Sequence, residues 1–283
     1  TTPDFHNAIW TASRDAKASS DISVMIVISG SGPAVNSLTI LQDDDSLLAG
    51  SQVSPVPQNN RTLSFEAIIS DGNGVSDIAA AVLTFNGINF SMSKKGDVNA
   101  TTGIYSGNFS LYSSFPAGNY TVAAMASDFS GLSGSASTSF EYLSLTAIDV
   151  DSTSIVFFAS PGTTSEVVGD NSTSTTSNIT ITNAGNVQLD FDIWSTNFTS
   201  GGSLIDASKL QYKFGASYSN STSAGNLTNN KARKDVNLNP DSKTGLSLRL
   251  NVPVATSLGN YSGKISLSPL LLNPPILTLI SSS

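Results

Sequence analysis

Short segments in which apolar and polar residues alternate recur along this chain, and they limit it to a β-rich fold. Alternation with a period of two places the apolar side chains on one face of a strand, where they can cover a core. We expect such strands at residues 37–42, 62–70, 78–85, 88–93, 103–112, 120–127 and 135–143. A second set is expected at residues 145–150, 153–160, 177–183, 187–195, 210–215, 244–252 and 260–268. This spacing of short strands is typical of β-sandwiches.

Helices are not expected, because residues that favour them are scarce. Glu occurs only at Glu66, Glu141 and Glu166. The Asn86-Gly87 pair stands between two apolar segments and predicts a two-residue hairpin turn, since both turn positions need positive φ. The sequence therefore predicts an all-β fold with two tandem sandwich domains.

The domain boundaries follow from the grouping of these segments. We expect an N-terminal arm at residues 1–33, a first domain at 34–144, a second domain at 145–268 and an apolar C-terminal tail at 269–283. The motif GIYSGNFSL at 103–111 resembles GNYSGKISL at 259–267, and PAGNYTV at 116–122 repeats the Gly-Asn-Tyr theme. In β-sandwiches, a Tyr at such a strand start bonds a neighbouring loop through its hydroxyl.

Residues 22–29 (ISVMIVIS) form an uncharged run that is apolar on both faces of a strand. Such a strand needs cover on both sides. The preceding residues 1–20 are polar and are interpreted as an irregular extended arm, and residues 30–33 (GSGP) as a flexible break. We interpret the run as an assembly strand that pairs with a neighbouring molecule through Ile22, Val24, Met25, Ile26, Val27 and Ile28. The apolar residues 270–280 are a rival for the same role.

The charge and composition exclude several classes of partner. The formal net charge is −8, which argues against nucleic acid, because binding phosphates needs clustered Lys and Arg. Cys is absent, so no disulfide or thiolate site forms. No apolar run reaches about 18 residues, so no membrane span is expected. The chain begins at Thr1, which we interpret as removal of a leader or a late start.

Asn-X-Ser/Thr sequons are frequent, and they suggest an N-glycosylated surface protein that carries N-linked glycans. They occur at Asn60, Asn89, Asn99, Asn108, Asn119, Asn171, Asn178, Asn197, Asn220, Asn226 and Asn260. The alternative is that abundant Ser and Thr create sequons by composition alone. Sequons within strands, such as Asn108 and Asn119, must point outward to be used.

No catalytic residues are identified, and an enzyme is not expected. His6 is the only histidine, and no acid or nucleophile is placed to cooperate with it. The motifs of serine hydrolases, phosphate-binding loops and dinucleotide-binding folds are absent.

One acidic segment is a candidate calcium site, the sole cofactor considered. SDGNGVS at 70–76 and SDFSGLS at 127–133 share the pattern Ser-Asp-X-X-Gly-apolar-Ser, and each closes an expected strand. If these corners lie at the same end of a sandwich, oxygens of Asp71, Asn73, Asp77 and Asp128 could converge on a hard cation. The alternative is turn chemistry, in which Asp and Asn bond their own backbone.

Residues 35–143 resemble the immunoglobulin-like sandwich modules of prokaryotic surface proteins. SNITITNAGNVQLDF, which begins at residue 177, and RLNVPVATSLGNYSGKISL, which ends at 267, resemble the terminal sandwich module of archaeal secreted and envelope proteins, including S-layer-like surface proteins. An apolar strand ahead of such modules is similar to archaeal thread-type filament subunits. That resemblance implies two immunoglobulin-like domains and an N-terminal donor strand that inserts into the next subunit.

Three functional hypotheses follow. The first is a structural subunit of an extracellular filament or cell-envelope layer, a homopolymer that donates residues 22–29 head-to-tail to copies of itself. The alternative is a monomeric adhesin or carbohydrate-binding module of a secreted surface protein, in which this strand closes inside its own first domain. The third is a non-catalytic fragment of a secreted hydrolase. All three place the chain outside the cell or at its surface.

Overall fold

A computed structural model describes residues 4–12, 20–28, 30–215 and 224–272, with only the backbone described for 4–12 and 20–28. This part of the chain folds into β-strands and two short 3₁₀ helices, so the expected all-β class is confirmed. Contacts divide the chain into two compact units. Unit 1 comprises residues 1–53, 62–111 and 119–142, and unit 2 comprises 54–61, 112–118 and 143–283.

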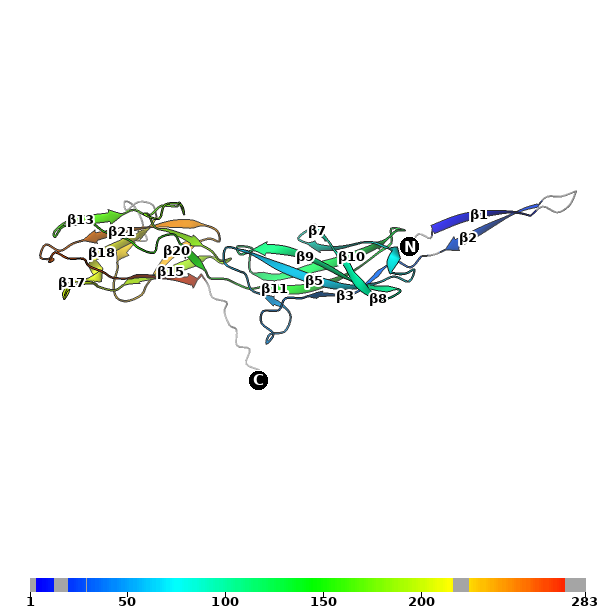
Figure 1. The fold of residues 1–283 in the computed structure, drawn as a ribbon, viewed down its shortest axis with the longest axis horizontal. Helices are drawn as coiled ribbons and strands as arrows, with labels where there is room; N and C mark the ends of the chain where they lie inside the picture. The colour runs from blue at the N-terminus through cyan, green and yellow to red at the C-terminus, as the bar shows by residue number, and fades with distance from the viewer. Residues whose placement is uncertain (1–3, 13–19, 29, 216–223, 273–283) are drawn as a thin grey trace. The chain divides into compact units, whose positions relative to one another are not determined.

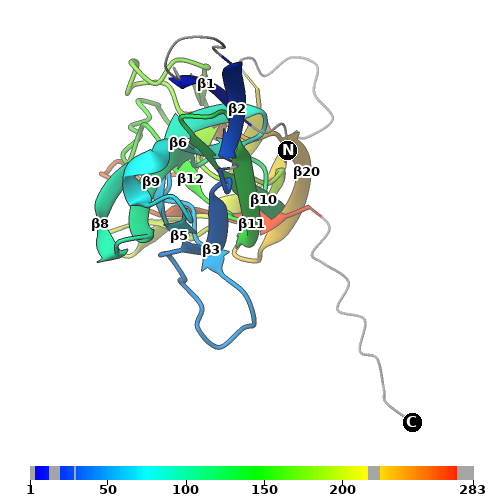
Figure 2. The same cartoon turned by 90° about the vertical axis from the view of Figure 1, so that its right-hand side faces the viewer.

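Apart from its N-terminal residues, which are described below, unit 1 contains two sheets whose strands are labelled in Figure 1. The four-stranded sheet has the order β3 (Ala34–Ile40), β5 (Asn60–Ser70), β9 (Thr102–Tyr112), β8 (Ser93–Asn99). The five-stranded sheet has the order β4 (Gln52–Val53), β11 (Ser133–Tyr142), β10 (Gly118–Asp128), β6 (Ile78–Phe85), β7 (Ile88–Ser91). In the end-on view of Figure 2, β8 lies toward the left of the sandwich and β10 and β11 toward the right.

The two sheets of unit 1 face each other across an aromatic core. The ring of Phe109 on β9 stacks on Phe85 of β6 at 4.6 Å between centroids and on Phe65 of β5 at 5.3 Å. Leu63, Phe65, Ala67 and Ile69 alternate along β5 and are all fully buried. The predicted period-two pattern therefore produces the core directly.

Several local predictions in unit 1 can be compared with the strands observed. The strand expected at 78–85 is β6, and the Asn86-Gly87 turn is confirmed by φ angles of 48° and 78°. Strand β8 was not predicted, since its sequence SKKGDVN is polar and every residue is exposed. Between β3 and β4, residues 41–51 loop away from both sheets in Figures 1 and 2.

Unit 2 also has two main sheets. The larger has the order β12 (Ile148–Val150), β14 (Thr180–Asn183), β21 (Lys243–Asn251), β18 (Leu210–Phe214), β19 (Ala224–Asn226), with β13 (Thr164–Val167) also paired to β21. The smaller is three-stranded, in the order β20 (Ala232–Leu238), β15 (Leu189–Ser195), β22 (Ile265–Leu271). A hairpin of β16 (Phe198–Ser200) and β17 (Ser203–Ile205) completes the unit.

The sheets of unit 2 enclose an apolar core that includes Phe191 of β15 and Phe214 of β18, whose rings stack at 5.4 Å. The strand expected at 153–160 is wrong, because these residues pair with no described strand. Ile155 and Phe157 nevertheless pack on the core, while Val156 and Phe158 face solvent. Burial therefore alternates along this segment as expected, but the segment forms no backbone pairing with a strand among the described residues.

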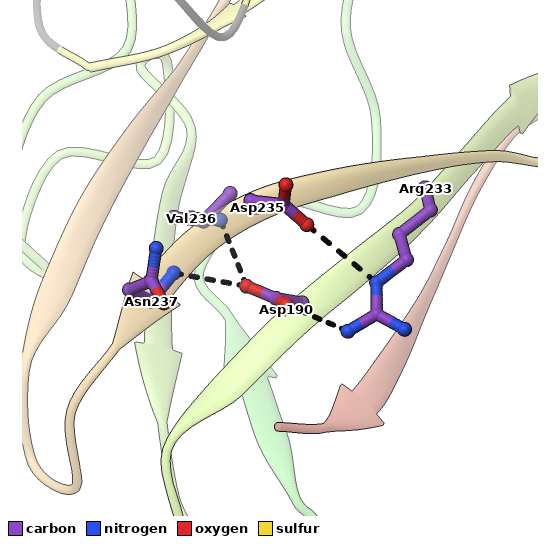
Figure 3. A network of polar contacts seen from close by, with 5 residues as sticks. All are labelled: Asp190, Arg233, Asp235, Val236 and Asn237. Atoms are coloured by element: carbon purple, nitrogen blue, oxygen red, sulfur yellow. Dashed lines mark hydrogen bonds and ion pairs between the residues drawn. The ribbon is translucent and has the colours of Figure 1, made fainter. Parts of the chain in front are cut away.

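A buried carboxylate secures the smaller sheet of unit 2 (Figure 3). The register between β15 and β20 shifts between Leu189 and Phe191, so a bulge of β20 lies opposite Asp190. Asp190 is fully buried, and its Oδ1 accepts hydrogen bonds from the backbone N–H groups of Val236 and Asn237 at 2.9 and 3.0 Å. Its Oδ2 accepts a 2.9 Å bond from Arg233. The carboxylate therefore satisfies N–H groups that the bulge removes from the ladder.

The N-terminal segment differs from the irregular arm predicted for residues 1–20. Residues Asp4–Ala12 form β1, which pairs antiparallel with β2 (Ser20–Ile28) in a separate two-stranded sheet, here called the ribbon. The sequence DFHNAIWTA of β1 alternates only weakly, which is why it was not predicted as a strand. At the other end of the chain, β22 continues beyond Ser268, where the tail was expected to begin. Residues 273–283 of that tail lie outside the described residues.

Candidate functional site

Strand alternation places two aspartates inside one end of unit 1. Asp71 is the residue after β5, where it continues the buried alternation that runs to Ile69, and it is only 2% exposed. On β10, Asp128 continues the buried series of Val122, Ala124 and Ala126, and it is 4% exposed. The two strands belong to different sheets, so both carboxylates point inward from opposite layers.

A third carboxylate joins them from the 3₁₀ helix η1 (Val75–Asp77). One carboxylate oxygen each from Asp71, Asp77 and Asp128 lies within 4.8 Å of the other two. The backbone of Phe129 donates a 3.1 Å bond to the carbonyl of Asp77, which ties the two loops together. The corners that the repeated Ser-Asp-X-X-Gly pattern singled out therefore do lie at the same end of the sandwich.

The hydrogen bonds of this cluster use only one oxygen of each buried aspartate. Asp71 Oδ1 accepts from the backbone N–H of Asn73 at 2.8 Å. Asp128 Oδ1 accepts from Ser130 Oγ at 2.9 Å and from the N–H of Leu132 at 2.8 Å. The Oδ2 atoms of Asp71 and Asp128 are buried and have no hydrogen-bond partner within the described chain. Hydrogen bonds within the turns thus satisfy the Oδ1 atoms of Asp71 and Asp128 and leave their Oδ2 atoms unpaired.

Loss of solvation and the neighbouring carboxylates both affect the pKa of Asp77. Loss of solvation raises the pKa of its carboxyl above the ordinary 3.8, and the charges of Asp71 and Asp128 raise this pKa further. No ion pair within the described residues brings a Lys or Arg to any of the three carboxylates. The cluster is therefore an uncompensated concentration of anionic oxygen.

Asn73 takes a different role from the one expected. Its side-chain Oδ1 accepts bonds from Ser31 N at 3.0 Å and Ser31 Oγ at 3.1 Å. A Cβ added at Gly72 would lie 2.3 Å from Ser31 Oγ, and one at Gly32 would lie 2.9 Å from Leu132 Cβ. Residues 30–33, which connect β2 to β3, therefore rest on both loops of the carboxylate cluster.

The residues of the expected assembly strand lie on β2, paired with β1 of the same chain. Over these residues the register is antiparallel and continuous: it begins with Ile22 opposite Trp10 and ends with Ile28 opposite Asp4. Between these pairs, Val24 lies opposite Ala8, Met25 opposite Asn7, Ile26 opposite His6 and Val27 opposite Phe5. Ser29 lies outside the described residues. Neither strand of the ribbon joins the sheets of unit 1 or unit 2 in the described part of the chain. The expected strand thus has one edge paired within its own chain and no place in either sandwich.

The smaller sheet of unit 2 ends at β22, whose second edge has no partner among the strands described. The Tyr261 hydroxyl donates a 3.0 Å bond to the carbonyl of Ser257, which confirms the expected Tyr contact just before this strand. All seven residues of β22 are partly exposed. In unit 1, β10 begins with the equivalent Gly-Asn-Tyr motif. Its second edge is paired with β11, and the inward residues of β10 are buried.

The sequons that the structure describes are mostly accessible. Asn60, Asn89, Asn99, Asn108, Asn119, Asn171, Asn226 and Asn260 are exposed, and Asn178 and Asn197 are partly buried. Asn178 Nδ2 donates a 3.2 Å bond to Asp170, so glycosylation there would remove a contact. Asn220 lies outside the described residues. The strand sequons Asn108 and Asn119 do point outward, as their use requires.

The single histidine and the glutamates considered in the sequence analysis do not form a common site among the described residues. His6 lies on β1, whereas Glu66 of β5 pairs with Lys95 at 3.0 Å. Glu166 and Arg249 form an ion pair across β13 and β21. Within the described residues, no helix has the length and apolar character needed to cross a membrane.

No protein-family model matches the chain, and neither does any curated protein. Among solved structures, a chaperone–tip adhesin complex of CFA/I fimbriae matches 95% of this chain and 91% of its own, with 10% identity and a TM-score of 0.30. A Niemann-Pick type C2 protein from Japanese carpenter ant matches 41% of this chain and 96% of its own, with 7% identity and a TM-score of 0.28. The C-terminal domain of the Streptococcus agalactiae AgI/II polypeptide BspA matches 84% and 97%, with 11% identity and a TM-score of 0.20. These similarities are too low to assign a family.

Proposed function

We propose that this chain is a structural subunit of an extracellular filament or cell-envelope layer, in which one copy donates its N-terminal ribbon to the next. The observation that carries the proposal is the edge of the smaller sheet of unit 2: β22 has no partner on its second side among the described strands, and its core-facing Ile265 and Leu267 are only partly buried. The chain itself carries an apolar strand, β2, that belongs to neither sandwich.

The two units supply an internal comparison. In unit 1 the sheet continues from β10 to β11 and β4, and it has five strands. In unit 2 the corresponding sheet has three strands among the residues described, and β22 is its last strand. The ribbon has two strands, so β2 placed against β22 would give the order β20-β15-β22-β2-β1. Such a sheet has as many strands as its counterpart in unit 1, and β1 need not separate from β2.

The chemistry of β2 fits this position. Alternate residues of a strand share a face, so Ile22, Val24 and Ile26 would extend the core beside Ile265 and Leu267. Backbone hydrogen bonds would provide affinity, and the alternating side chains would set the register. Because the donating and accepting surfaces are different, the contact is head-to-tail, and it produces a fibre when the rotation between subunits does not close a ring.

The setting is part of the same proposal. In this proposal, units 1 and 2 are tandem immunoglobulin-like sandwiches of a glycosylated surface protein, and the subunit is of the archaeal thread-type or S-layer-like kind that the sequence motifs resemble. The exposed sequons and the acidic composition support this location. The monomeric adhesin alternative requires β2 to close inside the sandwich of unit 1, whereas in the described part of the chain β2 pairs with β1 in the ribbon and joins neither sandwich sheet.

The experiment compares the full chain with a variant that lacks residues 1–30, using light scattering and negative-stain microscopy. The full chain should form filaments or oligomers, and the deletion should leave monomers. A matched pair of charge variants refines the test. Val24→Lys plus Ile26→Lys on the core-facing side should block assembly, whereas Ser23→Lys on the opposite face should weaken it less. Assemblies that persist without residues 1–30 would overturn strand donation, and a full chain that remains monomeric would favour the adhesin alternative.

A further inference from the structure

We infer that unit 1 binds one calcium ion through Asp71, Asp77 and Asp128, and that this ion fixes the loops on which residues 30–33 rest. The site does not depend on strand donation. It is built from three chain segments that meet at one end of the sandwich: the end of β5, the helix η1 and the end of β10.

The geometry of the oxygens fits a single ion. Calcium–oxygen bonds are about 2.3–2.6 Å long, so two ligands of one ion lie at most about 4.6–5.2 Å apart. The three carboxylate oxygens lie within 4.8 Å of one another. Their spacing is therefore close to that of ligands around one calcium ion.

The independent observation is the pair of unsatisfied oxygens. Asp71 and Asp128 are at least 96% buried, and their Oδ2 atoms have neither solvent nor a hydrogen-bond partner among the described residues. A buried anionic oxygen without a partner is strongly unfavourable. Loop hydrogen bonds hold the other oxygen of each residue, which fixes both carboxylates in place. A cation is the partner that such oxygens lack.

The ligand set favours calcium over magnesium. Magnesium requires near-octahedral geometry and retains several waters, whereas calcium accepts more carboxylate oxygens in an irregular arrangement. Asp71 and Asp128 are 2% and 4% exposed, which leaves little room for a hydrated ion on their side. Asp77 is partly exposed and marks the side from which an ion and its remaining waters would enter.

The ion would act beyond its own ligands. Asn73 lies between Asp71 and Asp77 in sequence, and its Oδ1 accepts two bonds from Ser31. Leu132, whose N–H bonds Asp128, lies against Gly32. Ordering of these two loops by calcium should therefore order residues 30–33, the connection between the ribbon and unit 1.

The test uses the full chain, freed of metal with a chelator and titrated with calcium chloride alone. Isothermal titration calorimetry should give one ion per chain with a dissociation constant near the millimolar range that is usual for extracellular modules. Thermal melting should rise by roughly 5 °C or more at about 10 mM calcium. Magnesium chloride at the same concentration should produce a clearly smaller shift. Hydrogen exchange at residues 30–33 should slow when calcium is added.

Asp128→Asn and the control Asp235→Asn each remove one negative charge, and Asp235 has a side chain that is 79% exposed. In chelator, Asp128→Asn should melt at or above the wild-type temperature, because its amide can donate to the neighbouring carboxylates. It should lose most of the calcium shift, and Asp235→Asn should retain it. No heat and no melting shift with calcium would overturn the site. Equal calcium shifts in the two variants would overturn the assignment of its ligands.

Discussion

Replacement of Asp190 tests whether the bulge of β20 depends on a buried acceptor. In Asp190→Ala, the N–H groups of Val236 and Asn237 lose their acceptor, and each buried unsatisfied donor costs about 1–3 kcal/mol. Val236 is half-buried and Asn237 is exposed, so the lower half of that range applies. The ion pair with Arg233 adds little to this, since that side chain is 52% exposed. We expect a total loss of about 2–4 kcal/mol.

Asp190→Asn separates the two contributions. The amide keeps an oxygen at the position that accepts both N–H bonds, but it loses the charge toward Arg233. Its cost should be clearly smaller than that of Asp190→Ala and similar to that of Arg233→Gln. Urea unfolding can be followed by Trp194 fluorescence on β15 in a Trp10→Phe background, because the chain has two tryptophans. If Asn costs as much as Ala, the ion pair and not the N–H groups controls the bulge, and the reasoning is refuted.

Three further predictions concern other contacts. Hydrogen bonds, chiefly from Thr175, lower the pKa of Asp170 from 3.8 to about 2. The ionised Asp170 therefore stabilises the folded state fully above pH 3.8, and this contribution to the unfolding free energy is lost as the pH falls toward 2. The difference in unfolding free energy between wild type and Asp170→Asn should therefore shrink over that interval, and a constant difference would contradict it. Tyr261→Phe should cost about 0.5–1 kcal/mol in urea unfolding, and no change would show that its hydroxyl contact is replaced by water. Gly134→Ala should destabilise unit 1 by about 1–3 kcal/mol, since its Cβ would lie 2.0 Å from the Pro33 carbonyl, whereas Gly96→Ala meets nothing within 4 Å. Similar melting temperatures for these two glycine variants would contradict that geometry.

The sequence predicts strands well where burial creates alternation. Strand β6 was predicted at its observed bounds, because its inward residues are apolar and its hairpin turn has a distinctive pair of residues. Strands β8 and β20 were missed, since SKKGDVN and ARKDVNL are polar or charged and are held by backbone pairing to their neighbours. Strand pairing of this kind leaves little trace in composition.

The carboxylate cluster was partly predictable for the same reason. The repeated pattern identified Asp71 and Asp128 as equivalent corners, and their phase in the alternation of β5 and β10 places both inside the sandwich. The side-chain contact of Asn73 with Ser31 was not predictable, because it joins segments 42 residues apart. Long-range side-chain contacts of this kind follow from the packed loops and not from a local motif.

Disulfide trapping tests the central claim most directly, because the chain contains no cysteine of its own. One cysteine is introduced on the outward face of β2, as Ser23→Cys or Met25→Cys, and one on β22, as Ser266→Cys or Ser268→Cys. Two batches of the protein that carry different tags are mixed and oxidised, and they should give disulfide-linked multimers. Mass spectrometry should identify a disulfide between a β2 peptide of one tagged copy and a β22 peptide of the other. A control that carries Ser93→Cys on the exposed edge strand β8 in place of the β22 cysteine should remain unlinked. Assemblies that form but yield no β2–β22 disulfide at any of these positions would contradict donation of the ribbon to unit 2.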